Sequence, residues 1–213
     1  MESGQQDPKK SQLIHLAILV SGQGSNMQAI LEAISNKKIT GIRPCVVISS
    51  RPHVPALAKA EACGVPSIYI ASKKNTFEST KDDFTQQLID CLNNYEVTPE
   101  KGLICLAGFM KILNKRFVDL YRGRLLNIHP SLLPSFPGLD AVGQALKYGV
   151  KVTGCTVHVV DEGVDTGKIL KQAAVEVKED DTHDILQARI HAQEHEMYPE
   201  AIAEFVQSKL SLQ

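Results

Sequence analysis

An amide and an imidazole stand two residues apart in the stretch NIHPSLLP, as Asn127 and His129. The residues before them predict a short buried strand, and alternate side chains of a strand point to the same side. Both groups can donate hydrogen bonds, so together they suit a negative charge that develops on an oxygen during acyl-type transfer. A histidine that merely packs before a proline turn explains the same pattern, and this motif alone does not choose between the two.

A glycine-rich turn, SGQGSN at residues 21–26, follows the first predicted strand and precedes a helix. Glycines let the backbone turn tightly, and the free N–H groups at the start of a helix bind anions such as phosphate. The turn lacks the third glycine of the dinucleotide-binding fingerprint, since Met27 stands there, and no G-K-[ST] follows as in a Walker loop. The pattern fits a phosphate site and a plain structural turn about equally well.

The third candidate is the acidic loop DEGVDTG at residues 161–167. Its carboxylates could be solvated, could bind a cation, or could place one carboxylate against His129 and keep that imidazole protonated. The spacing does not match an EF-hand, and no Cys/His set supplies a transition-metal site. We therefore predict no metal, and the spacing leaves the other two interpretations open.

Three further histidines are interpreted without a chemical role. His158 lies in the middle of a predicted strand and is interpreted as a packed core residue. His191 and His195 are one helical turn apart with Glu194 between them, a spacing that can bind metal, but the H-E-x-x-H motif is absent. A polar helix face is the preferred interpretation of that pair.

The elements that must position these groups alternate between buried strands and amphipathic helices. Strands are predicted at 13–20, 44–49, 66–70, 102–107 and 124–128, and helices from about 26 and at 57–62, 77–94 and 115–121. This alternation predicts βαβ units and a parallel sheet. Two β-rich segments, 151–160 and 168–177, flank the acidic loop and predict an added antiparallel pair. A helix at 184–209 follows, kinked or split at Pro199.

Composition is that of an ordinary globular protein, with 213 residues, 43% hydrophobic and 22% charged. The net charge of -1 and the scattered Lys and Arg argue against nucleic acid as a partner. No apolar run reaches membrane-spanning length, and residues 1–12 carry no signal- or transit-peptide pattern, so we expect a cytoplasmic protein without membrane contact. The five cysteines form no C-x-x-C pair and are expected to act as small buried hydrophobes.

Four segments in a fixed order are more specific than any single motif. They are GSN at 24–26, LAGFMKIL at 106–113, LLNIHPSLLP at 125–134 and VDTG at 164–167. With these segments the sequence resembles the phosphoribosylglycinamide formyltransferase family, the folate-dependent enzymes of purine synthesis, from about residue 13 to residue 210. NIHPSLLP is specific to this group and its relatives, and GSN narrows the likeness to the glycinamide branch.

The fold we expect is α/β, with one Rossmann-like open sheet, mostly parallel with an antiparallel C-terminal strand pair, and helices on both faces, which the resemblance identifies as the formyltransferase fold. We expect residues 1–12 to be a disordered leader and residues 13–213 a single domain. Within it, the resemblance implies a phosphate-binding half at about 13–122 and a folate-binding and catalytic half at about 123–210.

The resemblance also implies an activity and a set of roles. The enzyme would transfer the formyl group of 10-formyltetrahydrofolate, its co-substrate, to the amine of glycinamide ribonucleotide. The catalytic residues would be Asn127, His129 and Asp165, the substrate phosphate would be bound by Gly24, Ser25 and Asn26, the ribose by Glu194, and the folate by Met110, Lys111, Ile112, Leu113, Leu125, Asp161, Glu162 and Asp165. The amine would attack directly, with Asn127 and protonated His129 stabilising the oxyanion. Only small-molecule partners are expected, for a monomer or weak homodimer.

The sequence departs from the family pattern at two places. Lys111 stands where the family commonly has Arg, and GLDAVG at 138–143 replaces a stretch that often carries histidines, one of them where this chain has Val142. Three alternatives also stay open: a 10-formyltetrahydrofolate hydrolase, a formyltransferase for another amine on the same fold, and a non-catalytic folate- or nucleotide-binding module. The intact set of Asn127, His129 and Asp165 argues against the last.

Overall fold

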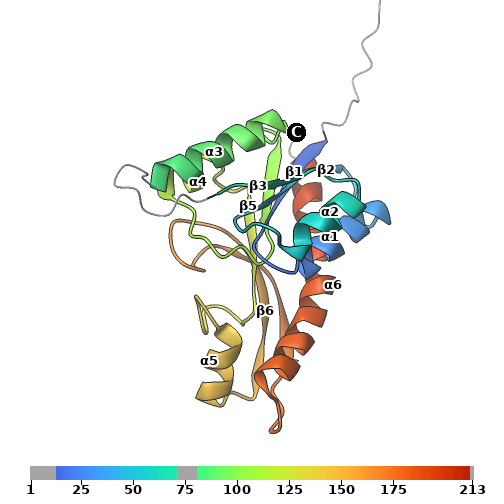
Figure 1. Cartoon of the computed structure of the whole chain (residues 1–213). Helices are drawn as coiled ribbons and strands as arrows, with labels where there is room; N and C mark the ends of the chain where they lie inside the picture. Colours follow the sequence, from blue (N-terminus) through green and yellow to red (C-terminus); the bar gives the residue numbers. More distant parts are fainter. Residues whose placement is uncertain (1–12, 72–80, 212–213) are drawn as a thin grey trace, which may run out of the picture.

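One seven-stranded sheet organises the chain, in the strand order β3-β2-β1-β4-β5-β6-β7 (Figure 1). The computed structural model describes residues 13–71 and 81–211. The strands are β1 Ile14–Val20, β2 Ile42–Ser49, β3 Ser67–Tyr69, β4 Gly102–Leu106, β5 Leu125–His129, β6 Val152–Val159 and β7 Ile169–Glu176. The predicted strands are all present, with ends shifted by a few residues.

The first five strands run parallel and the last two pair antiparallel, which confirms the predicted architecture. β1 lies between β2 and β4, and β5 follows β4, so the carboxyl ends of β1, β4 and β5 meet at one edge of the sheet. The antiparallel register places Asn127 of β5 opposite His158 of β6, and His129 opposite Thr156. The sheet edge and this register bring Asn127, His129 and His158 close together.

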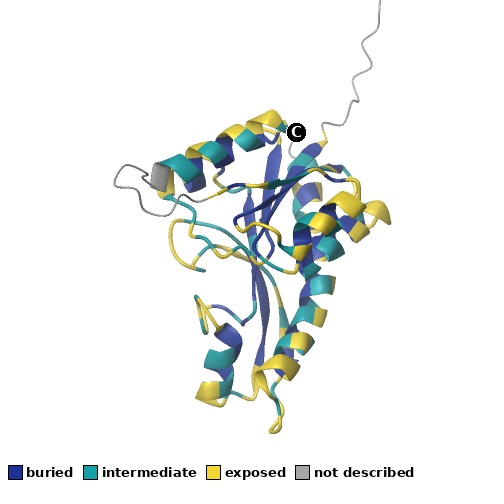
Figure 2. Cartoon of the chain, viewed as in Figure 1, coloured by how far each residue is buried: buried dark blue, intermediate teal, exposed yellow. Residues whose placement is uncertain are grey.

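Helices cover both faces of the sheet, and buried side chains lie between the layers (Figures 1 and 2). The helices are α1 Ser25–Ser35, α2 Pro55–Ala62, α3 Lys81–Asn94, α4 Lys115–Leu120, α5 Ala141–Tyr148 and α6 His183–Leu210. One apolar cluster joins the sheet to α1, α2 and α6, and a second joins it to α3 and α4. The predicted start of α3 at Phe77 lies outside the described residues. Within the described ranges, no helix is long and apolar enough to cross a membrane.

The last helix was predicted to be kinked or split at Pro199, and the split is wrong. α6 runs without interruption from His183 to Leu210, with Pro199 inside it. A proline removes one intrahelical hydrogen bond, but Tyr198 on one side of it and Ile202 and Val206 on the other are fully buried in the core. Packing on both sides of Pro199 therefore holds the helix together across the missing bond.

Helix α5 was not predicted, although its end signals are present in the sequence. Asp140 caps its start, because its side chain accepts a hydrogen bond from the Gly143 amide at 3.1 Å. Gly149 ends it with a φ of 80°, a left-handed conformation that suits glycine. Gly143 inside such a short segment hides the helical pattern, since glycine is a poor helix former.

The cysteines largely match the expectation of small buried hydrophobes. Cys45, Cys105 and Cys155 are buried, Cys91 is partly buried and Cys63 is exposed, and all five are free thiols. Burial raises the pKa of both Cys105 and Cys155 to about 12, so neither is a thiolate near neutral pH. Cys63 alone departs from the expectation, because it caps the exposed end of α2.

Candidate active site

The three predicted catalytic residues come together at the carboxyl end of β5. His129 Nδ1 lies 3.3 Å from Asp165 Oδ2, and both side chains are largely shielded from solvent. Asp165 belongs to the loop between β6 and β7, and Asn127 precedes His129 by two positions on β5. The carboxylate, the imidazole and the amide thus reach the same edge of the sheet from two neighbouring segments.

Both ring nitrogens of His129 face oxygen acceptors. Nδ1 faces the Asp165 carboxylate, and Nε2 lies 2.8 Å from the main-chain carbonyl of Phe136. The imidazole is thus placed between a carboxylate and a main-chain carbonyl, which fixes the orientation of the ring.

The carboxyl group of Asp165 is held in its ionised form. Burial by itself would raise its pKa, but a hydrogen bond from His158, the Gly138 amide at 2.8 Å and the charges of the two imidazoles outweigh burial. The pKa of Asp165 consequently lies below its ordinary value. A charged carboxylate beside His129 is the third interpretation that the loop sequence left open.

His158 is buried in the middle of β6, as its interpretation as a core residue predicts, but its ring also contacts two residues of this site. Its Nε2 lies 3.1 Å from Asn127 Nδ2 and 3.6 Å from Asp165 Oδ1. Its Nδ1 faces the Val159 carbonyl at 3.1 Å. The register between β5 and β6 puts His158 opposite Asn127, and only a prediction of that antiparallel pairing could have revealed it. His158 therefore orients both the amide and the carboxylate.

The loop that carries Asp165 is stiffened by its own hydrogen bonds. Asp161 Oδ1 accepts from the Gly163 amide at 3.1 Å and from Thr166 Oγ1 at 2.7 Å. Asp165 itself adopts a φ of 55°, in the left-handed region that Asp and Asn tolerate better than most residues. The conformation of the loop is thus fixed by side chains on both sides of Asp165.

The glycine-rich turn forms the start of α1 as predicted. Gly24 is the N-cap residue, with a φ of 72°, and no side chain caps the first turn. A Cβ at Gly24 would lie 2.6 Å from the Ala56 side chain, so both the conformation and the contact with α2 require glycine. The first amides of a helix have no intrahelical acceptor and attract anions. Ser21 connects the turn to the segment between β4 and α4, because its Oγ accepts a hydrogen bond from the Met110 amide at 2.9 Å.

A buried carboxyl group lies against the first turn of α1. Glu194 of α6 accepts a hydrogen bond from Asn26 Nδ2 at 2.7 Å, although the two residues are 168 positions apart in the sequence. Burial raises the pKa of Glu194 to about 7, against the lowering effect of that bond. Within the described residues, Asn26 Oδ1 has no hydrogen-bond partner, so the pair presents polar atoms that a ligand could bond.

His191 and His195 flank Glu194 on the same helix. Both are partly buried, their rings stack with centroids 6.2 Å apart, and burial lowers the pKa of each. His191 Nε2 lies 4.0 Å from Glu194 Oε2. Among the residues that the structure describes, no group of three or more His, Cys, Asp or Glu side chains is arranged to hold a metal ion. The two imidazoles therefore lie beside Glu194 on the same helix.

Glu194→Gln should change the pH dependence of stability. The folded-state pKa of Glu194, about 7, lies above the ordinary glutamate pKa of 4.5. Glu194 therefore contributes stability that is fully present below pH 4.5 and is lost as the pH rises through the folded-state pKa. Glutamine does not ionise, so the variant should gain up to about 3 kcal/mol of unfolding free energy relative to wild type between pH 5 and pH 8. Denaturant unfolding at both pH values measures this difference.

Glu196→Gln provides the matched control for that prediction. Glu196 is exposed on the same helix, so its replacement should leave the difference from wild type unchanged between the two pH values. A pH-independent difference for Glu194→Gln would show that the buried carboxyl group does not titrate in this range.

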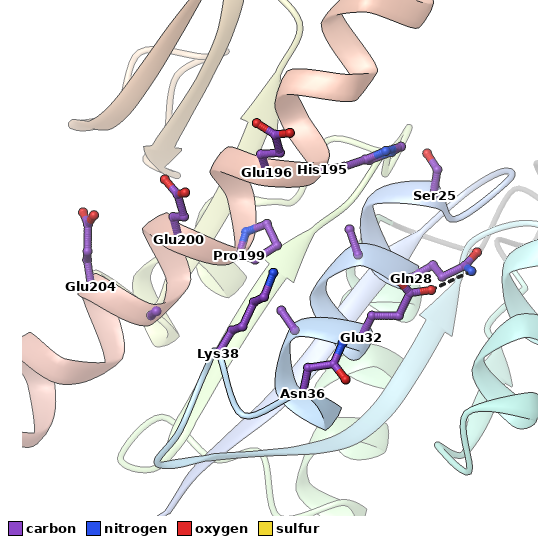
Figure 3. A pocket seen from close by; sticks show the side chains of 13 residues that line it. Ser25, Gln28, Glu32, Asn36, Lys38, His195, Glu196, Pro199, Glu200 and Glu204 are labelled. Atoms are coloured by element: carbon purple, nitrogen blue, oxygen red, sulfur yellow. Dashed lines mark hydrogen bonds between the residues drawn. The ribbon is translucent and has the colours of Figure 1, made fainter.

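A groove of about 800 Å³ runs between α1 and α6. Figure 3 shows Ser25 and His195 at one end of the groove and Glu204 at the other. Four glutamates, Glu32, Glu196, Glu200 and Glu204, line it, and none of the three predicted catalytic residues does. The groove therefore reaches the glycine-rich turn at its Ser25 end, but its acidic walls do not suit an anion farther along.

The residues predicted to contact folate fall into exposed and buried groups. In the segment between β4 and α4, Met110 is 60% and Ile112 is 88% exposed, while Leu113 packs against the core. Lys111 Nζ lies 4.6 Å from the centre of the Phe84 ring. Leu125 is fully buried, so its side chain is part of the core in this conformation. Met110 and Ile112 therefore offer the apolar surface of this set.

Known proteins resemble this chain in both sequence and structure. The family described as formyl transferase matches residues 14–202. The chain is 44% identical to the trifunctional purine biosynthetic protein adenosine-3 of Drosophila melanogaster, over 94% of the chain but only 16% of that protein. It is 41% identical to the phosphoribosylglycinamide formyltransferase of Bacillus subtilis, over 89% of the chain and 93% of that protein. The crystal structure of glycinamide ribonucleotide transformylase 1 from Symbiobacterium toebii superposes with a TM-score of 0.87 at 42% identity, covering 97% of this chain and 94% of that one.

Proposed function

The chain belongs to the formyl transferase family, and on this premise we propose that it transfers the formyl group of 10-formyltetrahydrofolate to the amine of phosphoribosylglycinamide in purine biosynthesis. The observation that carries the proposal is the convergence of Asn127, His129 and Asp165 at the carboxyl end of β5. Ligand binding alone does not require an amide, an imidazole and a buried carboxylate at one point, whereas this set can stabilise a developing oxyanion and handle a proton.

The reaction is a direct transfer. The substrate amine attacks the formyl carbon, a new C–N bond forms, and the formyl oxygen takes up negative charge. Asn127 Nδ2 carries two hydrogens and is held 3.1 Å from His158 Nε2, and one of these hydrogens is donated to the oxyanion. The positive charge of His129 stabilises the same oxygen. The bond to the folate nitrogen then breaks, and the proton lost by the amine passes to that nitrogen, with Asp165 as its carrier through water.

The phosphate and ribose of the acceptor are assigned to the start of α1. The phosphate binds the uncapped amides around Gly24, Ser25 and Asn26, where the helix dipole favours negative charge. The ribose hydroxyl groups bond Glu194, which is ionised above its raised pKa of about 7. The hydrogen bond between Ser21 and the Met110 amide links this turn to the segment assigned to folate.

The folate is assigned to the space between the segment Met110 to Leu113 and the loop between β6 and β7. The exposed side chains of Met110, Ile112 and Val164 support this assignment, because a folate ring that covers them removes apolar surface from water. Asp161 Oδ1 is engaged by hydrogen bonds within its own loop, so the proposed role of Asp161 includes holding the loop that lies against the folate.

A spectrophotometric assay of the folate product, with and without phosphoribosylglycinamide, tests the proposal. Product that forms only with the ribonucleotide establishes both the transferase activity and its acceptor. Equal product in both reactions identifies a 10-formyltetrahydrofolate hydrolase instead. Absence of product in both overturns the proposal in favour of another amine acceptor or a binding module, which a screen of amine acceptors separates.

The proposal also includes small-molecule partners only, a cytoplasmic location and a monomeric or weakly dimeric state. Cell fractionation tests the location, and sedimentation over a range of protein concentrations tests the state of association.

A further inference from the structure

Two cationic side chains near α4 hold the loop that carries Asp165. Lys115 Nζ forms an ion pair with Glu162 Oε1, and Arg122 Nη2 lies 3.1 Å from the same oxygen. Glu162 is three positions before Asp165 in the loop between β6 and β7. These ion pairs therefore hold the loop against α4 and the residues after it, and Glu162 and Arg122 are 40 positions apart in the sequence.

Asp119 completes this arrangement into a closed network. Its carboxylate pairs with Arg122 and lies 3.3 Å from Lys115 Nζ, so two cations alternate with two carboxylates. We refer to Lys115, Asp119, Arg122 and Glu162 as the loop clamp. All four side chains are between 39% and 66% exposed, and a single exposed ion pair would contribute little. The network is stronger than one pair, because each charge has two partners of opposite sign.

The α4 side of the clamp is rigidly anchored in the core. Asn114 caps the helix by accepting from the Phe117 amide at 2.9 Å, and Phe117 and Val118 are buried. Tyr121 donates from its hydroxyl to the Val97 carbonyl at 2.8 Å. Lys115 and Asp119 are one helical turn apart and share a face, and Arg122 lies just beyond the last turn. A fixed set of charges thus meets the loop.

The clamp lies between the two segments assigned to the folate. α4 continues directly from the segment Met110 to Leu113, and Glu162 belongs to the opposing loop (Figure 1). Met110, Ile112 and Val164 are more than half exposed, so apolar packing does not fix the distance between the two segments. The contacts of Glu162 with Lys115 and Arg122 fix the distance between these segments.

We propose that the loop clamp is a positioning device that sets the width of the folate site and the place of Asp165, and that Glu162 acts through it rather than by touching the folate. This inference rests on the proposed function. It differs from the role that the resemblance implied for Glu162, because the carboxylate of Glu162 faces the cations of α4.

Glu162→Gln should raise the KM for the formylfolate donor by about threefold to tenfold, the effect of losing two exposed ion pairs. The KM for the ribonucleotide should stay unchanged, because its assigned site lies at α1. Raising the ionic strength from about 0.01 M to about 1 M should raise the donor KM of wild type toward that of the variant, since salt screens exposed charges. A variant with the wild-type donor KM at low salt would overturn the proposal.

A charge swap separates positioning from direct contact. Glu162→Lys alone places three cations together and should impair donor binding more than Glu162→Gln. Reversing the other three charges as well, with Lys115→Glu, Asp119→Lys and Arg122→Glu, restores alternating charges and should recover most of the donor affinity. A Glu162 that contacts the folate itself predicts no recovery, and that result would overturn the proposal. Glu204→Gln, which removes an exposed partner of Lys171 at 2.7 Å between β7 and α6, is the matched control and should leave the donor KM unchanged.

Amide hydrogen exchange of residues 161–167 tests the clamp without catalysis. Glu162→Gln should speed exchange of these amides, and the variant with all four clamp charges reversed should slow it again. Unchanged exchange in Glu162→Gln would overturn the clamp whatever reaction the protein catalyses. Faster exchange in Glu162→Gln, together with no formyl transfer by the wild-type protein, would instead overturn the proposed function. The loop clamp would still stand as the network that holds this loop.

Discussion

Asp165→Asn is expected to lower kcat by about 10²- to 10⁴-fold, the range for losing a group that handles protons in the transition state. The carboxylate pairs with His129 at 3.3 Å and keeps the imidazole charged. A neutral amide at this position removes the charge that favours imidazolium and cannot carry the proton released by the amine. The two KM values should stay near those of wild type, because neither the start of α1 nor the exposed apolar surface at Met110 and Ile112 changes.

Asparagine is the informative replacement because it preserves the structure of the loop. Asp165 has a φ of 55°, a conformation that asparagine adopts readily. The side-chain oxygen of asparagine can still accept from the Gly138 amide, now at 2.8 Å from Asp165 Oδ2. A loss of rate with an unchanged thermal midpoint would therefore report on chemistry rather than on folding.

Steady-state kinetics and thermal unfolding of the purified variant check this prediction. Asp140→Asn is a suitable control, because Asp140 also has a left-handed φ, 53°, and accepts a main-chain amide while remaining exposed. The control should retain close to the wild-type rate. A near-normal rate for Asp165→Asn would remove Asp165 from the mechanism.

Asn127→Ala is expected to lower kcat by about 10²- to 10³-fold, the cost of removing one oxyanion donor. The amide is already oriented before substrate binds, because Nδ2 lies 3.1 Å from His158 Nε2 and Asn127 pairs with His158 across the strands. Alanine loses both the donor and this orientation. The oxyanion exists only after the amine has attacked. The substitution should therefore raise the free energy of the transition state and leave that of the bound substrates unchanged.

Calorimetric titration with the folate product distinguishes a loss of transition-state stabilisation from a loss of ligand binding. The product affinity should be unchanged in Asn127→Ala while kcat falls. Asn93→Ala, the same chemical change at an exposed position of α3, should leave both quantities unchanged. A parallel loss of product affinity and rate would contradict the assignment and identify Asn127 as a binding residue.

Much of the fold follows from local sequence. The apolar runs at 13–20 and 102–107 and the amphipathic stretches after them predict βαβ units, and those units form β1, α1, β4 and α4. Pro199 and the segment 141–148 show where local reasoning fails. Burial on both sides of Pro199 overrides a helix breaker, and the isolated Gly143 conceals a helix whose two caps are visible in the sequence.

The sequence by itself determined which chemical groups are available and which strand end presents Asn127 and His129, since both follow from residue type and from the two-residue period of a strand. Only the tertiary structure decided which distant groups face them. His158 reaches Asn127 through antiparallel register, Glu194 reaches Asn26 across 168 positions, and Glu162 reaches Lys115 across 47. Local sequence encodes backbone geometry over a few residues, whereas these contacts depend on how helices pack on the sheet and on how its strands align.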